Sequence, residues 1–276
     1  MNPIRYIRNF VNYMRSGGAV YAVVQQIAYD RMLEGKTAVI TGGTSGIGFA
    51  IAQKFLRLGA SVCIIGRNEE KLAQTVNETA CSKDSVFPYV WDLKDVADAQ
   101  MHIATIEKIL GTIDIWVNNA GIYIGKTDNY SEEEWDAVMD TDCRSLYFVM
   151  EAVTERMQGT CGATKKIINI TSNRGVFADR GPYGAAKVAA ISLTQGFAKK
   201  FATRGIIINS IAPGITASNI NRIDPSGNIY VDEPPNYRVA LPQEIAELAA
   251  FLASDAANHI VGQNIVCDGG QTILSI

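Results

Sequence analysis

The sequence predicts an α/β fold: a doubly wound parallel sheet of seven strands, of the Rossmann type, in a single domain. Short apolar runs rich in β-branched residues alternate with segments of helical periodicity from residue 36 onward. Turn residues follow these runs, and no linker or internal repeat interrupts the alternation. This order is typical of a parallel sheet with helices on both faces, whose functional loops lie at the carboxyl ends of the strands.

Length and composition fit this class. The chain has 276 residues, of which 47% are hydrophobic and 19% charged, as in a soluble globular protein. The net charge of −3 and the lack of a basic cluster argue against nucleic-acid binding. Five scattered cysteines without a Cys-x-x-Cys pair indicate free thiols in a reducing compartment, so we expect a cytoplasmic protein. Two histidines outside any metal-ligand spacing predict no metal site.

Residues 1–33 precede the first strand, and we expect a helical extension followed by a domain over 34–276. The first 15 residues carry three arginines and no acidic residue, and their apolar residues fall on one helical stripe. Such a segment can lie on a membrane surface. It can also pack on this protein or on a second copy, and we favour this second interpretation. The apolar run 19–29 is too short to span a bilayer.

The first predicted strand, helix and intervening turn form a candidate dinucleotide site. A strand is expected over 37–40 and a helix over 47–58, with glycines at 42, 46 and 48 between them. Glycines permit a tight turn and close backbone approach, while the N–H groups of a helix start attract a pyrophosphate. The spacing is Gly-x3-Gly-x-Gly rather than the Gly-x-Gly-x-x-Gly of the usual fingerprint.

The remaining elements follow in order along the chain. A capping box at Ser131-x-x-Glu134 and a proline at position 242 mark two helix starts. Strands are expected over 61–65, 86–91, 113–117, 167–170, 206–211 and 264–267, and helices over 69–80, 96–110, 131–157, 183–202 and 242–253.

A tyrosine and a lysine carry the candidate chemistry. Tyr183 is the only one of 11 tyrosines that has a lysine four residues later, so on a helix it shares a face with Lys187. A tyrosine pKa of about 10 is poorly suited to proton transfer near neutrality. A lysine cation at about 4 Å and an effective dielectric constant near 20 would stabilise the tyrosinate by roughly 4 kcal/mol. Tyr183 could then protonate a carbonyl while Ser172 hydrogen-bonds the same oxygen.

The ordered motifs resemble those of the compact, single-domain branch of the short-chain dehydrogenase/reductase family, including its 3-oxoacyl-carrier-protein reductase-like members. The motifs are Thr41-Gly-x3-Gly-x-Gly48, Asn118-Asn-Ala-Gly121, Ser172, Tyr183-x3-Lys187 and Pro213-Gly214. The resemblance covers residue 36 to the C-terminus. It implies that the cofactor and the active site share one domain and that hydride passes between NAD(P) and a secondary alcohol or carbonyl. It also implies that Lys187 binds the nicotinamide ribose.

The resemblance assigns the cofactor contacts to the strand ends. It implies cofactor contacts of Gly42, Thr44, Ser45, Gly46, Ile47, Gly48, Asp92, Leu93, Asn119, Ala120, Gly121, Pro213, Gly214, Ile215 and Ser218. An acidic residue after the second strand would bind the ribose 2′-hydroxyl, whereas an arginine would accept a 2′-phosphate. Gly66 and Arg67 stand there, so we expect NADP(H) to be preferred, with NAD(H) still open.

One catalytic position departs from the family. Where the family has an asparagine whose backbone carbonyl holds a water in the proton relay, this chain has Asp142. The backbone role survives the change, but an ionised side chain near Lys187 would stabilise the ammonium and offset its effect on Tyr183. An orientation of this side chain away from Lys187, as a local cap, is equally open.

The substrate is a small carbonyl or alcohol compound that the sequence does not identify. The family's substrate lid corresponds to residues 216–240, where Asp224-Pro-Ser-Gly227 predicts a turn and a later Pro-Pro pair excludes a helix. Arg174 and Arg180 could hold an acidic substrate. The interval from Ser172 to Tyr183 is about two residues shorter than in 3-oxoacyl-carrier-protein reductases by resemblance, which leaves a keto acid or a keto sugar open.

Two other classes of protein remain as alternatives to this oxidoreductase, and the resemblance also predicts an oligomeric state. A non-catalytic nucleotide-binding protein would not need the Ser–Tyr–Lys set. A sugar-nucleotide-modifying enzyme would usually carry a larger C-terminal substrate domain. By resemblance we expect a homo-oligomer, a tetramer or a dimer, that pairs helices 131–157 and 183–202 and the strand 264–267 across two-fold axes.

Overall fold

The computed structural model describes residues 7, 11, 29–79, 85–125, 128–157, 164–218, 223–224, 226–232 and 234–273. These residues form a seven-stranded sheet with the order β3-β2-β1-β4-β5-β6-β7, and every neighbouring pair is parallel. The predicted doubly wound α/β fold is therefore confirmed. The strands are β1 Thr37–Thr41, β2 Ser61–Gly66, β3 Val86–Val90, β4 Ile115–Asn118, β5 Lys165–Ile170, β6 Ile206–Pro213 and β7 Asn264–Cys267.

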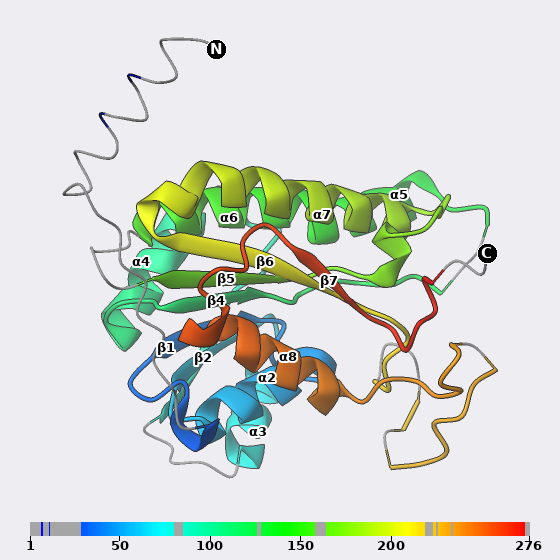
Figure 1. Ribbon diagram of the computed structural model, residues 1–276, viewed down its shortest axis with the longest axis horizontal. Helices are drawn as coiled ribbons and strands as arrows, with labels where there is room; N and C mark the ends of the chain where they lie inside the picture. The colour runs from blue at the N-terminus through cyan, green and yellow to red at the C-terminus, as the bar shows by residue number, and fades with distance from the viewer. Residues whose placement is uncertain are drawn as a thin grey trace.

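Helices cover both faces of this sheet (Figure 1). On one face, α2, α3 and α8 enclose a core that includes Phe55, Ile64 and Leu72. On the other face, α4 to α7 lie over a second core around Trp116 and Met150. The helices are α2 Gly46–Arg57, α3 Glu69–Glu78, α4 Ala99–Leu110, α5 Glu132–Met139, α6 Ser145–Arg156, α7 Pro182–Phe201 and α8 Pro242–Ala253.

The strands agree with their predicted positions to within two residues. Strand β5 begins two residues early because Lys165 and Lys166, which break the apolar pattern, find partners at its start. The Lys165 Nζ lies 2.7 Å from Asp114 Oδ1, and Lys166 donates to Asn258 Oδ1. Strand β6 is buried along its whole length, and its two polar side chains are hydrogen-bonded: Asn209 donates to the Ile260 carbonyl and Ser210 donates to Asn264 Oδ1.

The helix predicted over 131–157 is confirmed over 132–156, but it is not α-helical throughout. A π-helical turn, Asp140–Arg144, separates α5 from α6, and the Ser145 N–H bonds to the Asp140 carbonyl five residues back. The start of α5 does carry the predicted capping box, with Glu134 N–H donating to Ser131 Oγ at 3.2 Å. A π-turn adds a single residue to the helical repeat, which hydrophobic periodicity does not reveal, and such turns are frequent at functional sites.

Two predicted segments are described only in part. Of residues 1–28 only Ile7 and Val11 are described, so the predicted amphipathic extension falls outside the described residues; Leu33 is fully buried in the core. The part of 216–240 that is described contains no helix, and the Gly227 N–H donates to the Asp224 carbonyl at 3.1 Å in the predicted turn. Among the described residues, no helix is long and apolar enough to cross a membrane.

Candidate active site

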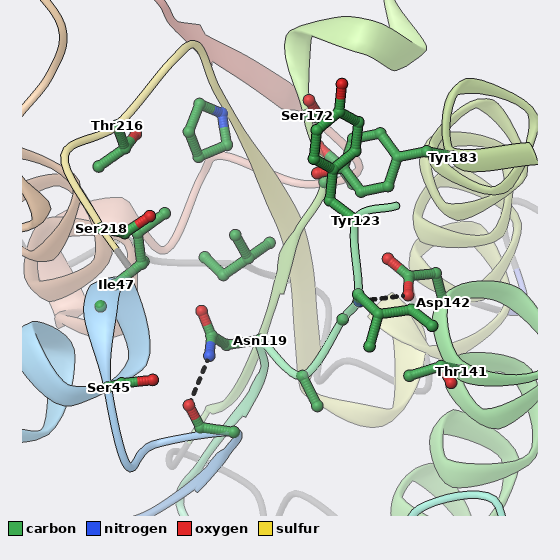
Figure 2. Close-up of a pocket in the computed structure, with 18 of the residues that line it drawn as sticks. Ser45, Ile47, Asn119, Tyr123, Thr141, Asp142, Ser172, Tyr183, Thr216 and Ser218 are labelled. Carbon is green, nitrogen blue, oxygen red and sulfur yellow. Dashed lines mark hydrogen bonds between the residues drawn. The ribbon is translucent and has the colours of Figure 1, made fainter. Parts of the chain in front are cut away.

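A cavity of about 560 Å³ opens at the carboxyl ends of β1, β2, β4, β5 and β6. This is where the chain order of the strands reverses, between β1 and β4, and where open α/β sheets bind their ligands. The loop after β1, the loop after β4 and the start of α7 each contribute a wall (Figure 2). All of the catalytic and cofactor-binding residues predicted from the sequence line it, except Gly48.

The turn after β1 contains glycines at positions where a side chain would clash with neighbouring residues or strain the backbone. Gly42 and Gly46 have φ values of +62° and +55°, in the left-handed region that favours glycine. A Cβ on Gly42 would lie 2.9 Å from the Ala120 Cα, and one on Gly48 would lie 2.4 Å from Asn119 Nδ2. The Ser45 side chain makes no capping hydrogen bond at the start of α2. This backbone cradle at a helix N-terminus fits a dinucleotide pyrophosphate. Gly48 does not line the cavity, and its lack of a side chain allows α2 to pack against Asn119.

Asn119 ties the end of β4 to the end of β1 (Figure 2). Its Nδ2 donates to the carbonyls of Thr41 and Gly42, both at 3.0 Å, and its backbone N–H donates to Thr41 Oγ1 at 2.9 Å. These bonds hold the two loops on opposite sides of the strand reversal in a fixed arrangement. The cofactor cradle is therefore built before any ligand binds.

The end of β2 forms the remote part of the cavity. Arg67 lines it as an exposed side chain, together with Lys71 on the first turn of α3, Asp92 and Leu93. A Cβ on Gly66 would lie 2.9 Å from Thr44 Cγ2, so a larger residue is crowded at the position where an acidic residue would bind a ribose. Sequence reasoning missed Lys71, whose signal was its spacing of four residues from Arg67 at a helix start.

Ser172, Tyr183 and Lys187 line one region of the cavity. The Lys187 side chain is 6% exposed, and its Nζ lies 5.3 Å from the centroid of the Tyr183 ring. Ser172 Oγ accepts a hydrogen bond from the Arg174 N–H at 3.2 Å. Tyr123, which the sequence did not single out, packs edge-on against Tyr183 with ring centroids 5.2 Å apart, and Figure 2 shows both rings beside Ser172.

Asp142 on the π-turn faces Lys187 with its side chain. Its Oδ2 lies 2.9 Å from the Lys187 Nζ as an ion pair, and its fully buried carboxylate accepts the Ile122 N–H at Oδ1, at 2.8 Å. Oδ2 contacts the Lys187 ammonium as an ion pair, and it has no other polar partner among the described residues. A Cβ on Gly121 would lie 2.7 Å from Oδ2, so glycine at this position makes room for the carboxylate.

The charge of Lys187 is set by two opposing effects. Burial acts to lower its pKa, but the Asp142 carboxylate, with a smaller contribution from Tyr183, outweighs burial and raises the pKa of Lys187 above its usual value. A raised pKa stabilises the fold below the unfolded value of about 10.4, and this contribution is lost only when the pH rises through the folded value. Lys187 is therefore a cation throughout the neutral range.

The two candidate arginines are not equivalent. Arg174 lines the cavity, whereas Arg180 does not and instead pairs with Asp128 at an exposed site. Several lining residues were not predicted, because apolar and small polar side chains in loops carry no sequence signal. They include Ile122, Thr141, Thr171, Asn173, Thr216 and Ile223.

The fold and this cavity are those expected of a dinucleotide-dependent oxidoreductase, with the candidate cofactor cradle and the candidate acid–base residues lining one cavity at the carboxyl ends of the strands. A family model described as enoyl-(acyl carrier protein) reductase matches residues 42–272. The 3-oxoacyl-(acyl-carrier-protein) reductase of Chlamydia muridarum is 39% identical over 251 residues, which cover 87% of this chain and 98% of that protein. The 3beta-hydroxysteroid dehydrogenase 2 of Eggerthella lenta is 36% identical over 261 residues, covering 90% and 98%.

A solved structure agrees with the sequence relatives. The 3-ketoacyl-(acyl-carrier-protein) reductase of Brucella melitensis, complexed with NADH, matches with a TM-score of 0.79 at 29% identity, covering 87% of this chain and 100% of that one. The chain belongs to the short-chain dehydrogenase/reductase family. It is an NAD(P)-dependent enzyme that interconverts a carbonyl and an alcohol.

Proposed function

We propose that Tyr183 is the acid–base group of this reaction, that Ser172 polarises the carbonyl, and that Lys187 tunes Tyr183 and binds the nicotinamide ribose. The observation that carries the proposal is the buried Lys187 cation 5.3 Å from the Tyr183 ring, beside Ser172 in one cavity. A cation at this position favours the tyrosinate. Ser172 Oγ accepts the Arg174 N–H, and its own proton makes only a long hydrogen bond of 3.5 Å to Asn173 Oδ1, which a substrate oxygen can replace.

In the reductive direction Tyr183 and Ser172 both act on the carbonyl oxygen of the substrate, and Tyr183 supplies the proton. A nicotinamide cofactor held in the cradle would supply the hydride to the carbonyl carbon. Tyr183 gives its hydroxyl proton to the carbonyl oxygen, which becomes the alcohol, and the resulting tyrosinate is stabilised by Lys187. Ser172 donates a hydrogen bond to the same oxygen as negative charge develops on it. Turnover of NADPH with a panel of ketones tests this proposal; cofactor binding without any turnover would contradict it.

The cofactor preference is the second part of the proposal. Arg67 and Lys71 place two cations on the remote wall of the cavity, and Gly66 takes the position after β2 at which an acidic residue would bind the ribose 2′-hydroxyl and repel a 2′-phosphate. A 2′-phosphate gains charge-assisted hydrogen bonds from such groups. The cradle residues bind the parts that NADP(H) and NAD(H) share, so we propose that NADP(H) is preferred and NAD(H) is a weaker cofactor.

Replacing Arg67 by alanine is expected to reduce the preference for NADPH over NADH by about 10- to 100-fold, because a hydrogen bond to a charged group is worth about 1.5–3 kcal/mol. Dissociation constants for both cofactors, measured by calorimetry, check this result. Arg57→Ala removes another exposed arginine, at the end of α2 and off the cavity, and serves as the matched control. A preference that is unchanged in Arg67→Ala would remove Arg67 from the site.

We also propose a homo-oligomer, a tetramer or a dimer, built on the outer face of α5 to α7 and on β7. Large apolar side chains are exposed along these elements, and such exposure marks an interaction surface. These side chains are Trp135, Tyr147, Phe148, Val188 and Val266. Light scattering at micromolar concentration is expected to give at least twice the 29.9 kDa mass of one chain, and a monomeric mass would contradict the assembly.

A further inference from the structure

The loop between Ser172 and Tyr183 carries two arginines, only one of which is built into the cavity wall. Arg180 is 76% exposed and pairs with Asp128 outside the cavity. Arg174 lines the cavity, two residues from Ser172, with a side chain 47% exposed. Arg180 therefore serves as the comparison for Arg174, because it is a solvated arginine of the same loop.

Arg174 is held by two partners. Its Nη1 lies 3.2 Å from Asp179 Oδ2, and its guanidinium carbon lies 5.6 Å from the centroid of the Phe177 ring. The Asp179 carboxylate is itself fixed, because Oδ1 accepts the Gly181 N–H at 2.9 Å. A Cβ on Gly184 would come within 2.3 Å of the Asp179 Cβ, so α7 packs closely against this residue.

This anchoring reduces the cost of binding a ligand. A free arginine loses side-chain entropy when it binds, whereas one already held by an aromatic ring and a carboxylate loses less. A guanidinium has five N–H donors in a planar fork that matches a carboxylate, and the Asp179 contact occupies Nη1 alone. Asp179 offsets part of the charge, but its own oxygens are already bonded to Gly181 and Arg174.

We infer that Arg174 binds a carboxylate of the substrate, so that the enzyme acts on a keto acid and the corresponding hydroxy acid. This rests on the proposed function, because the carbonyl must reach Ser172 and Tyr183. The backbone N–H of Arg174 donates to Ser172 Oγ at 3.2 Å, so the residue that carries the guanidinium is held next to the residue that polarises the carbonyl. Arg174, Ser172 and Tyr183 line the same cavity, so one substrate could place its carboxylate at Arg174 and its carbonyl at Ser172 and Tyr183.

A matched pair of substrates tests this inference. Acetoacetate and methyl acetoacetate present the same ketone with and without a carboxylate charge. In Arg174→Gln we expect the ratio of kcat/KM for the acid to that for the ester to fall by about 10- to 100-fold, mainly through KM. Arg180→Gln removes the same charge from the same loop and is expected to leave this ratio within twofold of wild type. An unchanged ratio in Arg174→Gln, or an equal fall in Arg180→Gln, would overturn the inference.

Calorimetry separates this inference from the proposed function. The NADPH-bound protein is titrated with butanoate, an analogue that carries the carboxylate but no reducible carbonyl. We expect the affinity of the wild type to exceed that of Arg174→Gln by the same factor of about 10 to 100. Weakened binding in Arg174→Gln supports the inference even where turnover fails, and such a failure contradicts the acid–base proposal. Equal affinities of the two proteins overturn the inference.

Discussion

Replacing Tyr183 by phenylalanine is expected to lower kcat by at least about 100- to 10 000-fold, down to the background rate, because the variant lacks the proton that the carbonyl oxygen needs. The ring is retained, so its edge-on contact with Tyr123 and its position above Lys187 are preserved. The loss should therefore be in kcat, while the affinity for NADPH changes little. Reduction of a ketone that the wild type turns over, followed by NADPH absorbance, measures the effect.

Tyr123→Phe is the control that makes this result specific. Tyr123 lines the same cavity and its ring centroid is only 5.2 Å from that of Tyr183, so its hydroxyl is the nearest alternative phenolic donor in the described part of the cavity. We expect Tyr123→Phe to keep kcat within about tenfold of wild type, which is less than the roughly 100- to 10 000-fold that a general acid contributes. If Tyr183→Phe kept its turnover and Tyr123→Phe lost it, Tyr123 and not Tyr183 would be the general acid.

The sequence was most informative where one backbone conformation is required. Gly42 and Gly46 adopt left-handed φ values, and Gly48 touches Asn119, so each glycine of the turn has a reason that can be stated from spacing alone. The strands were visible because parallel strands buried on both faces are continuously apolar. Tyr183 and Lys187 stood out because a spacing of four residues has a fixed meaning on a helix.

Other features depend on tertiary contacts that no local pattern contains. The helix predicted over 131–157 is confirmed over 132–156, but the π-turn at Asp140–Arg144, which adds one residue to the helical repeat, was not predicted. The two lysines at the start of β5 are accommodated by partners far along the chain, Asp114 and Asn258. The different environments of Arg174 and Arg180 likewise depend on Asp179 and Asp128, whose placement the sequence does not specify.

Asp142→Asn is expected to shift the rate profile of the oxidative reaction to lower pH. In the wild type the carboxylate lies 2.9 Å from the Lys187 Nζ and offsets part of the positive charge that acts on Tyr183. An asparagine removes this negative charge, so Lys187 favours the tyrosinate more strongly and oxidation reaches its half-maximal rate at a lower pH. Deprotonation of Lys187 does not account for the rise of the oxidative rate with pH in the wild type, because Asp142 raises the pKa of Lys187.

The same variant tests how much the buried pair stabilises the fold. Deleting one partner of a buried ion pair costs about 3–5 kcal/mol, and the asparagine amide, which still reaches Ile122, should keep the loss below that range. Asp136→Asn removes an equal charge from an exposed position on α5 and controls for net charge. Full pH–rate profiles and thermal unfolding of the three proteins give the answer. Superimposable profiles for wild type and Asp142→Asn would leave Asp142 only a backbone role, whereas a downward shift confined to Asp142→Asn would assign the tuning of Lys187 to its carboxylate.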